Sequence, residues 1–231
     1  MINKKREIIL DTETTGLSLE GGDRIIEIAC LELIDCVPTG KSFQTYIKPE
    51  DKIVGEDAIK IHGLTNSFLK TQPPFKDIAK DFIKFIKDDV LIIHNASFDL
   101  SFINNELKMC LLNPIKNEVV DTVVLAKKVL GGGPVNLNAL CKRYEIDISK
   151  RKIHGALLDC NLLAGVYIEL RGGRQADLVF SSSSPLDQYK DNKTAHNKTR
   201  EIEKIDIKPE EIDTHKKMLK NIKNPLWEAN K

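Results

Sequence analysis

The sequence predicts an α/β fold with one mixed β-sheet flanked by helices. Three strand-like segments joined by short connections lie within the first fifty residues. Apolar residues then change to helical spacing over residues 75–87. A short apolar segment at 90–94 follows, and a second helical pattern comes soon after it. Strands that alternate with helices favour parallel pairing, so we expect a sheet that combines antiparallel and parallel strands.

The first three strands are predicted at residues 7–12, 24–33 and 42–48. The first is a short apolar run that ends in Asp and Thr, and the other two are rich in Ile and aromatic residues. Residues 21–22 (Gly-Gly) and 38–40 (Pro-Thr-Gly) are predicted turns between them. We therefore expect an antiparallel meander at the start of the sheet.

The rest of the first domain alternates helices with two further strands. The run VLIIH at 90–94 is apolar, as in a strand buried on both faces. Val119 and Val120 indicate another short strand. An antiparallel meander continued by two parallel strands is the architecture of the ribonuclease-H-like fold. Helices are predicted over residues 75–87, 98–111, 123–130, 136–144 and 156–170.

The composition is that of a soluble globular domain with a tail. The chain has 231 residues, of which 41% are hydrophobic and 30% charged. Its net charge of +1 excludes a polycation that grips nucleic acid through many phosphates. We expect weak binding to any nucleic acid, with a partner that keeps the protein on its substrate.

Neither a signal peptide nor a membrane span is expected. The apolar run near the N-terminus is too short for a signal peptide, and no window approaches the length of a membrane-spanning helix. The five cysteines are an odd number without a CxxC pair, which argues against a disulfide framework or a zinc site. We expect reduced thiols in a cytoplasmic protein.

The character of the sequence changes after residues 172–173 (Gly-Gly). Residues 181–200 are polar with three apolar side chains, and we expect a flexible linker there. The last thirty residues are charged and contain the only tryptophan, Trp227. We divide the chain into a domain at 1–173, a linker region at 174–200 and a C-terminal segment at 201–231.

Two carboxylates stand at the end of the first predicted strand. Asp11 and Glu13 are two residues apart, so a strand places both side chains on one face. Adjacent carboxylates repel each other, and a hard divalent cation such as Mg²⁺ relieves the repulsion. Taken alone, so short a motif is more often a plain polar strand end.

Two further motifs each bring an aspartate to a helix start. HNASFD, at 94–99, follows the strand at 90–94, at the strand end where open α/β sheets usually bind ligands. In HGALLD, at 154–159, His154 precedes the last long helix and Asp159 lies about one turn inside it. Asp99 could instead complement the helix dipole, and a single histidine is more often structural. The ordered set D-x-E, H-N-x-x-x-D and H-x(4)-D is far more specific than its parts.

These motifs resemble those of the DEDDh exonucleases. LDTETTGL at 10–17, HNASFD and HGALLDC match the three motifs of that family, and the resemblance covers residues 7–170. It implies a 3′→5′ exonuclease in which two Mg²⁺ or Mn²⁺ ions are held by four acids and a histidine takes a proton from the attacking water. The implied metal ligands are Asp11, Glu13, Asp99 and Asp159, and the implied catalytic base is His154.

The same resemblance implies which residues contact the terminal nucleotide. The turn after the first strand would approach the nucleotide, with a glycine that allows close backbone contact. An apolar wall would favour frayed, mismatched ends, because they cost less to unpair. The implied substrate-binding residues are Asp11, Glu13, Thr14, Gly16, Leu17, Ile61, His62, Phe98 and Asp159.

Other stretches are similar to the epsilon (proofreading) subunits of bacterial DNA polymerase III, namely IHGL at 61–64, HNASFDLSF at 94–102 and LCKRYEID at 140–147. This similarity implies DNA 3′ ends as substrate and nucleoside 5′-monophosphates as product. Gln175, Leu178 and Phe180 resemble a Q-x-x-L-x-F peptide that docks on the sliding clamp. Leu226 and Trp227 resemble the tail that binds the polymerase catalytic (alpha) subunit. A small third core subunit stays open as a further partner.

Two other functions stay open on the sequence. An RNA-trimming DEDDh enzyme would use the same active site, because the same metals cleave either backbone. The tail with its tryptophan argues against that function, since a free-standing trimmer has no use for it. A non-catalytic scaffold that joins polymerase to clamp is disfavoured, because all four acids and His154 are present.

Overall fold

The computed structural model describes residues 5–149, 151, 153–173 and 209–220. Its sheet has five strands in the order β3-β2-β1-β4-β5. β1 pairs antiparallel with β2 and parallel with β4, so the two kinds of pairing meet at the central strand. This confirms the predicted mixed sheet. The strands are β1 (Arg6–Thr14), β2 (Ile25–Ile34), β3 (Val37–Tyr46), β4 (Val90–Ile93) and β5 (Val119–Asp121).

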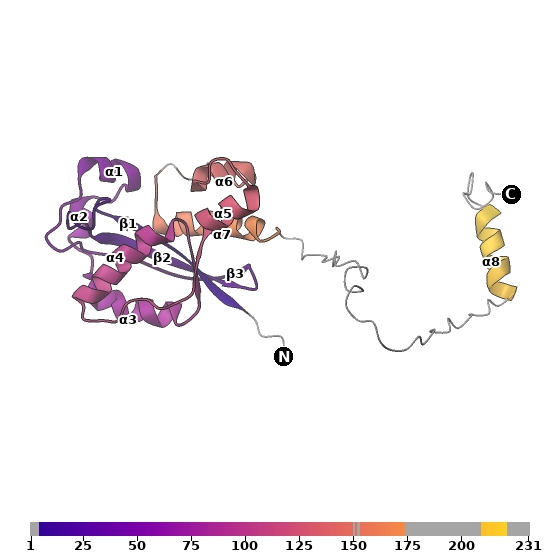
Figure 1. The fold of residues 1–231 in the computed structure, drawn as a ribbon, viewed down its shortest axis with the longest axis horizontal. Helices are drawn as coiled ribbons and strands as arrows, with labels where there is room; N and C mark the ends of the chain where they lie inside the picture. The colour runs from indigo at the N-terminus through magenta and orange to yellow at the C-terminus, as the bar shows by residue number, and fades with distance from the viewer. Residues whose placement is uncertain (1–4, 150, 152, 174–208, 221–231) are drawn as a thin grey trace, which may run out of the picture. The chain divides into compact units, whose positions relative to one another are not determined.

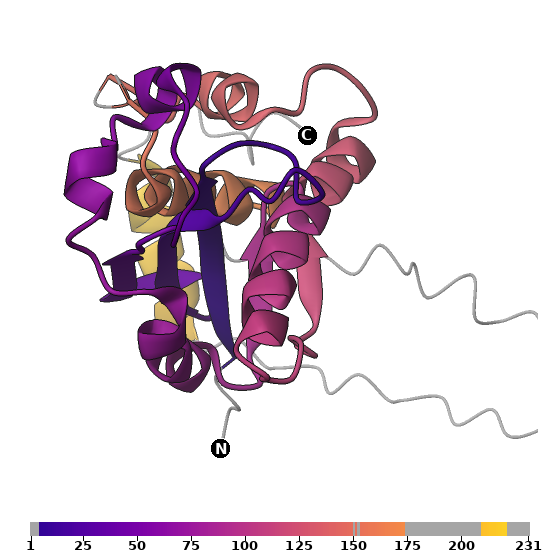
Figure 2. The same cartoon turned by 90° about the vertical axis from the view of Figure 1, so that its left-hand side faces the viewer.

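Helices cover both faces of this sheet (Figures 1 and 2). One face packs against α3 and α4, and the other packs against α5, α6 and α7. Each face has its own cluster of buried apolar side chains, so the sheet separates two cores. The helices of this unit are α1 (Glu56–His62), α2 (Asn66–Leu69), α3 (Phe75–Ile86), α4 (Ala96–Met109), α5 (Thr122–Leu130), α6 (Leu137–Arg143) and α7 (Ala156–Leu170).

Alternation along β1 assigns its side chains to these two cores. Ile8 and Leu10 belong to the α3–α4 core, whereas Ile9 belongs to the core under α7. Successive side chains of a strand point to opposite faces. Asp11 and Glu13 therefore continue the face of Ile9, toward α7, and the residue between them faces α4.

One predicted boundary was wrong. The segment at 38–40 is not the turn before the third strand, because β3 begins at Val37 and pairs with Ile34. The turn consists of Asp35 and Cys36, both with positive φ, as a two-residue hairpin with the right twist requires. Pro38 is tolerated inside β3 because β3 is an edge strand.

Two short helices were not predicted. α1 and α2 span seven and four residues, which is too short for a helical repeat of apolar residues to be visible. α1 ends at Gly63, whose φ of 73° and backbone N–H to the Ile59 carbonyl form a left-handed C-cap. The glycine of the IHGL stretch is thus explained by the end of a helix.

The chain divides into two units, residues 1–178 and 179–231. In the second unit the structure describes one helix, α8 (Pro209–Lys220), which the sequence analysis did not predict. Glu210 and Glu211 lie in its first turn, where acids favour the helix dipole. The predicted linker at 181–200 and the peptides at 175–180 and 226–227 lie outside the described residues.

All five cysteines are free thiols. Three of them, Cys30, Cys141 and Cys160, are buried. In the described part of the chain, no helix is both long and apolar enough to cross a membrane.

Candidate active site

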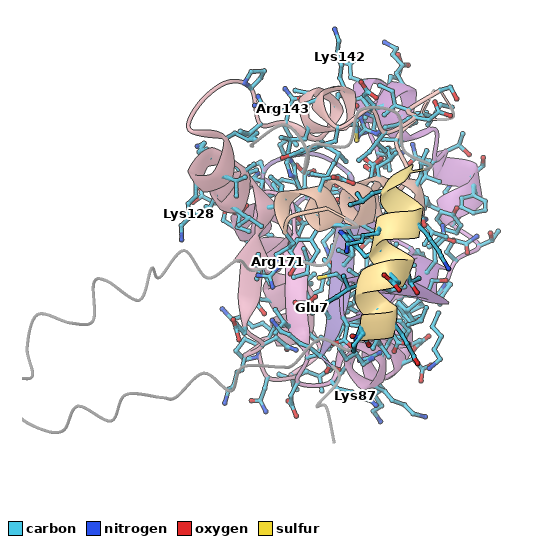
Figure 3. All side chains as sticks on the ribbon, turned by 90° about the vertical axis from the view of Figure 1, so that its right-hand side faces the viewer. Glu7, Lys87, Lys128, Lys142, Arg143 and Arg171 are labelled. Carbon is cyan, nitrogen blue, oxygen red and sulfur yellow. The ribbon has the colours of Figure 1, made fainter. Side chains whose placement is uncertain are left out.

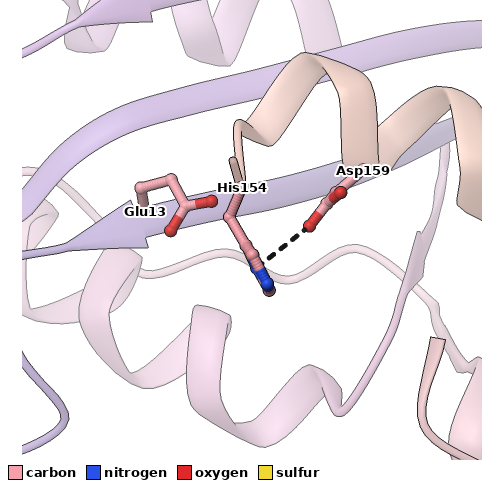
Figure 4. Close-up of side chains that lie close together, drawn as sticks. All are labelled: Glu13, His154 and Asp159. Carbon is pink, nitrogen blue, oxygen red and sulfur yellow. Dashed lines mark ion pairs between the residues drawn. The ribbon is translucent and has the colours of Figure 1, made fainter. Parts of the chain in front are cut away.

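Segments far apart in the sequence meet at the carboxyl end of β1. Glu13 comes from the strand, and His154 and Asp159 come from the start of α7 (Figure 4). One ligand atom from each of these three residues lies within 4.8 Å of the other two. Nδ1 of His154 is 3.6 Å from Oδ2 of Asp159. The strand end and the helix start are thus joined into one cluster, as the motif order predicted.

Asp99 reaches the same strand end from the opposite layer. It lies in the first turn of α4 and is 3% exposed. The hydroxyl of Thr12 donates to Oδ1 of Asp99 over 2.7 Å. Thr12 stands between Asp11 and Glu13 and faces α4, so the alternation of β1 brings acids from both layers together.

The environment of these acids disfavours their charged forms. Burial, and then the neighbouring carboxylates of Asp99 and Asp159, raise the pKa of Asp11 well above its ordinary value. Burial and Asp159 raise the pKa of Glu13 to about 8. Burial also raises the pKa of Asp99 to about 7, although the hydrogen bond from Thr12 opposes the shift. Asp11, Glu13 and Asp99 thus gather acidic groups close together, and the described residues neutralise their charge only in part.

This donor set fits a divalent metal ion. Carboxylate oxygens are the ligands that hard divalent cations prefer, and a cation would remove the repulsion that raises these pKa values.

Arg151 is a site residue that sequence analysis missed. Its Nε and one terminal nitrogen donate to the two oxygens of Asp159, each over 2.6 Å. The same terminal nitrogen lies 3.1 Å from Nδ1 of His154. The only signal in the sequence was an arginine three residues before the motif histidine, and surface arginines are common at such spacings.

The contact with Arg151 defines the tautomer of the His154 imidazole. A guanidinium only donates, so Nδ1 of His154 accepts, and a neutral ring then carries its proton on Nε2. Burial and the charge of Arg151 lower the pKa of His154, and Asp159 opposes this shift. His154 is therefore neutral near pH 7, with its free lone pair engaged by Arg151.

The loop after β1 depends on a glycine for a reason that the sequence did not reveal. A Cβ on Gly16 would lie 2.5 Å from a carboxylate oxygen of Asp23. That carboxylate accepts from the Ser18 backbone and from the Thr15 hydroxyl, each over 2.9 Å, and so shapes the loop. Thr14 is buried, and its hydroxyl donates to the Gly16 carbonyl over 2.6 Å.

Residues predicted to contact substrate differ in exposure. Leu17 and Ile61 are exposed at 85% and 52%. The Ile61 carbonyl accepts from the His154 backbone over 2.9 Å, so α1 lies beside the cluster. His62 is 5% exposed, and within the described residues its Nε2 has no hydrogen-bond partner. The ring of Phe98 packs on that of Phe102, 4.9 Å between centroids.

Comparison with known proteins agrees with this geometry. The sequence model of the exonuclease family (RNase T) matches residues 8–167. The chain is 46% identical over 223 residues to the DNA polymerase III subunit epsilon of Rickettsia felis, covering 94% of this chain and 96% of the relative. It is 36% identical over 239 residues to that of Escherichia coli K12, covering 97% and 98%.

Solved structures share the fold. The nuclease domain of 3′hExo, a DEDDh family member bound to rAMP, superposes with a TM-score of 0.66 at 18% identity and covers 74% of this chain and 94% of that domain. Exonuclease X in complex with 5′ overhanging duplex DNA gives a TM-score of 0.57 at 25% identity, covering 72% and 91%. The chain therefore belongs to the exonuclease family and, within it, to the DNA polymerase III epsilon subunits.

Proposed function

We propose that this chain removes mispaired nucleotides from DNA 3′ ends as the proofreading subunit of a bacterial replicative polymerase. The observation that carries the proposal is the convergence of Glu13, His154 and Asp159, from opposite ends of the domain, within 4.8 Å. Family membership adds the reaction type, a 3′→5′ exonuclease. The product is a nucleoside 5′-monophosphate.

Asp11, Glu13, Asp99 and Asp159 are the proposed holders of two Mg²⁺ or Mn²⁺ ions. The raised pKa values of the first three support this role, because burial and then the neighbouring acids disfavour their charged forms in the absence of a cation. When bound, such ions activate water and neutralise charge on the phosphodiester. The protein contributes the acids in fixed positions on β1, α4 and α7.

His154 is the proposed general base. Its side chain is 43% exposed, so water reaches the ring, and its lowered pKa keeps it neutral near pH 7. Proton uptake needs a free lone pair, which Arg151 occupies in this arrangement. Arg151 must therefore move off Nδ1 before His154 accepts a proton. The imidazole then takes the proton of the attacking water at that nitrogen.

The proposed contacts to the terminal nucleotide are Thr14, Gly16, Leu17, Ile61, His62 and Phe98, together with Asp11, Glu13 and Asp159. The exposure of Leu17 and Ile61 supports an apolar wall that stacks on a base or sugar. An unpaired end reaches such a wall more easily than a paired one.

The direct test is digestion of a primer–template with a matched or a mismatched 3′ end, with an RNA oligomer of equal length in parallel. Faster digestion of the mismatched DNA end supports proofreading. Equal rates on both DNA ends with faster RNA digestion would instead indicate an RNA-trimming enzyme. Omission of divalent metal should abolish all digestion.

The tail is proposed to bind partners, with boundaries at 1–173, 174–200 and 201–231. Gln175, Leu178 and Phe180 would contact the sliding clamp, and Leu226 and Trp227 would contact the polymerase alpha subunit. Sequence alone supports these contacts, together with the name of the relatives as polymerase subunits. Tryptophan suits the role because it buries much area at little entropic cost.

Deletion of residues 201–231 tests whether the tail binds the polymerase while residues 1–173 carry the nuclease activity. The truncated protein should digest single-stranded oligonucleotides at the wild-type rate and no longer co-purify with the polymerase alpha subunit. Full-affinity polymerase binding by the truncated protein would contradict the assignment. A linker of about 20 residues reaches roughly 25 Å, which would hold the nuclease near the DNA end at an effective concentration of about a millimolar.

A further inference from the structure

Glu27 is a buried carboxylate beside the cluster that the reaction itself does not use. It lies on β2, is 2% exposed and pairs across the β1–β2 ladder with Glu13. One of its oxygens accepts from the Gln44 side chain over 2.7 Å. The other accepts from the backbone N–H of Ala156 over 3.2 Å. Ala156 is the first residue of α7.

Helix α7 has no cap of its own. The first backbone N–H groups of a helix lack intrahelical partners, and a nearby Ser, Thr, Asp or Asn usually supplies one. The N-cap position of α7 is Gly155, which has no side chain to offer. Glu27, 129 positions away in the sequence, supplies that acceptor instead. An acid at this place also favours the positive end of the helix dipole.

The contact between Glu27 and Ala156 connects the strand side of the cluster, Glu13, to the helix side, His154 and Asp159. Asp159 lies in the first turn of α7, and its backbone N–H donates to the Gly155 carbonyl over 2.9 Å. His154 stands two residues before the helix. Glu27 is the ladder partner of Glu13. Its hydrogen bond with the Ala156 backbone therefore fixes Asp159 and His154 relative to the strand that carries Glu13.

The other helix that carries an acid of the cluster is capped in the same way. Asn95, the N-cap of α4, has a left-handed backbone and makes no side-chain cap. Asp121, at the end of β5, accepts from the Ala96 backbone over 3.0 Å. Each of these two helices thus begins on a carboxylate from a strand end. This repetition indicates a means of positioning rather than a chance contact.

We propose that Glu27 is a positioning residue of the active site, which holds the start of α7 so that Asp159 and His154 face Glu13. The proposal rests on the proposed nuclease function. Replacing a residue that orients a ligand or base commonly costs about 10–100-fold. Glu27→Ala should therefore lower kcat on a single-stranded oligonucleotide by about 10–100-fold.

Glu27→Gln separates the hydrogen bond from the charge. Its amide oxygen can still accept from Ala156, and Gln44 can turn its own amide to match. This variant should restore most of the turnover that Glu27→Ala loses. A glutamine variant as slow as the alanine variant would contradict the capping role, since the charge alone would then matter.

Glu7 provides a matched control, because it too is a buried strand glutamate that contacts α7 (Figure 3). It is a glutamate of β1, 1% exposed, and it accepts from the hydroxyl of Tyr167 on α7 over 3.0 Å. It lies six positions before Glu13 on β1, a distance of about 20 Å along the strand. Glu7→Ala should lower the melting temperature and leave kcat per folded molecule unchanged. A similar loss of kcat in both alanine variants would overturn the proposal, because general loosening of α7 would explain it.

Amide hydrogen exchange supplies a readout that does not depend on activity. In the metal-free full-length protein, Glu27→Ala should speed exchange at the Ala156 amide, whereas Glu7→Ala should not. Unchanged exchange at Ala156 would overturn the capping role. If the wild-type protein digests no nucleic acid, the proposed function fails, and the exchange experiment still decides whether Glu27 holds the helix.

Discussion

The two ends of the β1–β2 ladder shift the pKa of a glutamate in opposite directions. At the end where β1 begins, Glu32 is hydrogen-bonded to Arg6, Thr39 and Lys41, and these contacts lower its pKa to about 2. At the end where β1 finishes, burial and the acids around Glu13 raise the pKa of that side chain to about 8. Both glutamates belong to one continuous ladder.

The difference comes from the burial of Glu13 and from the groups around each side chain, not from the strand. Arg6 lies between Glu32 and Asp89, so positive charge is placed where two acids meet. At the other end Arg151 faces Asp159, and Asp11, Glu13 and Asp99 form no ion pair within the described residues. Acids that are paired with a cation, such as Glu32 and Asp89, hold the sheet and helices together. Acids that form no ion pair within the described residues, namely Asp11, Glu13 and Asp99, cost stability and leave the site suited to bind a cation.

Removal of an uncompensated acid should have the largest effect on activity. Asp11→Ala or Glu13→Ala should abolish metal-dependent exonuclease activity, while the melting temperature without metal stays the same or rises, because repulsion is relieved. Digestion of a labelled oligonucleotide and thermal melting on one preparation measure both. Glu32→Ala is the control, expected to lose stability and keep activity. A folded Asp11→Ala protein with metal-dependent exonuclease activity would contradict the assignment of Asp11 as a metal ligand.

His154→Ala should lower kcat by about 10²–10⁴-fold, the range expected for loss of a general base. Metal affinity should be largely retained, because the four acids remain. Turnover per folded molecule and melting temperature separate this role from a structural one. A variant that melts early but turns over normally would show that His154 supports the fold only.

Arg6→Ala should destabilise the end of the ladder where β1 begins. It leaves Glu32 and Asp89 without their shared cation and removes a hydrogen bond to the Phe85 carbonyl. We expect a loss of roughly 1–3 kcal/mol of unfolding free energy, typical of buried polar groups left unpaired. Urea unfolding measures it. Activity per folded molecule should not change, since the site lies at the far end of the strand.

The smallest expected effect is a pair of opposite pH dependences in the metal-free protein. The pKa of Glu13 is raised from about 4.5 to about 8, so the stability that it contributes is present below pH 4.5 and lost as the pH rises toward 8. The pKa of Glu32 is lowered to about 2, so its contribution is present above pH 4.5 and lost as the pH falls toward 2.

Melting temperatures between pH 2 and 9 in a chelator would measure both windows. Glu13→Gln should reduce the loss of stability between pH 4.5 and 8, to which Asp11 and Asp99 also contribute, and Glu32→Gln should reduce the loss below pH 4.5. A wild-type slope above pH 5 that Glu13→Gln leaves unchanged would show that other groups dominate this end of the ladder.

Much of this molecule was determined by sequence pattern alone. The apolar runs predicted β1, β2, β4 and β5, and the helical repeats predicted α3 to α7, because a core on each face of a sheet imposes a period of two or 3.6 on the residues that fill it. The spacing of Asp11 and Glu13, and the aspartates placed at two helix starts, predicted acids that meet at one strand end. The family resemblance supplied their roles.

Tertiary structure alone decided which side chains hold those acids. Arg151 donates hydrogen bonds to Asp159 and lies within hydrogen-bond distance of His154. Glu27 reaches Ala156 across 129 positions of sequence. No local period or motif marks such contacts, since they depend on packing between distant elements. The same holds for the turn at Asp35 and Cys36, where pairing between two strands overrode the signal of Pro38.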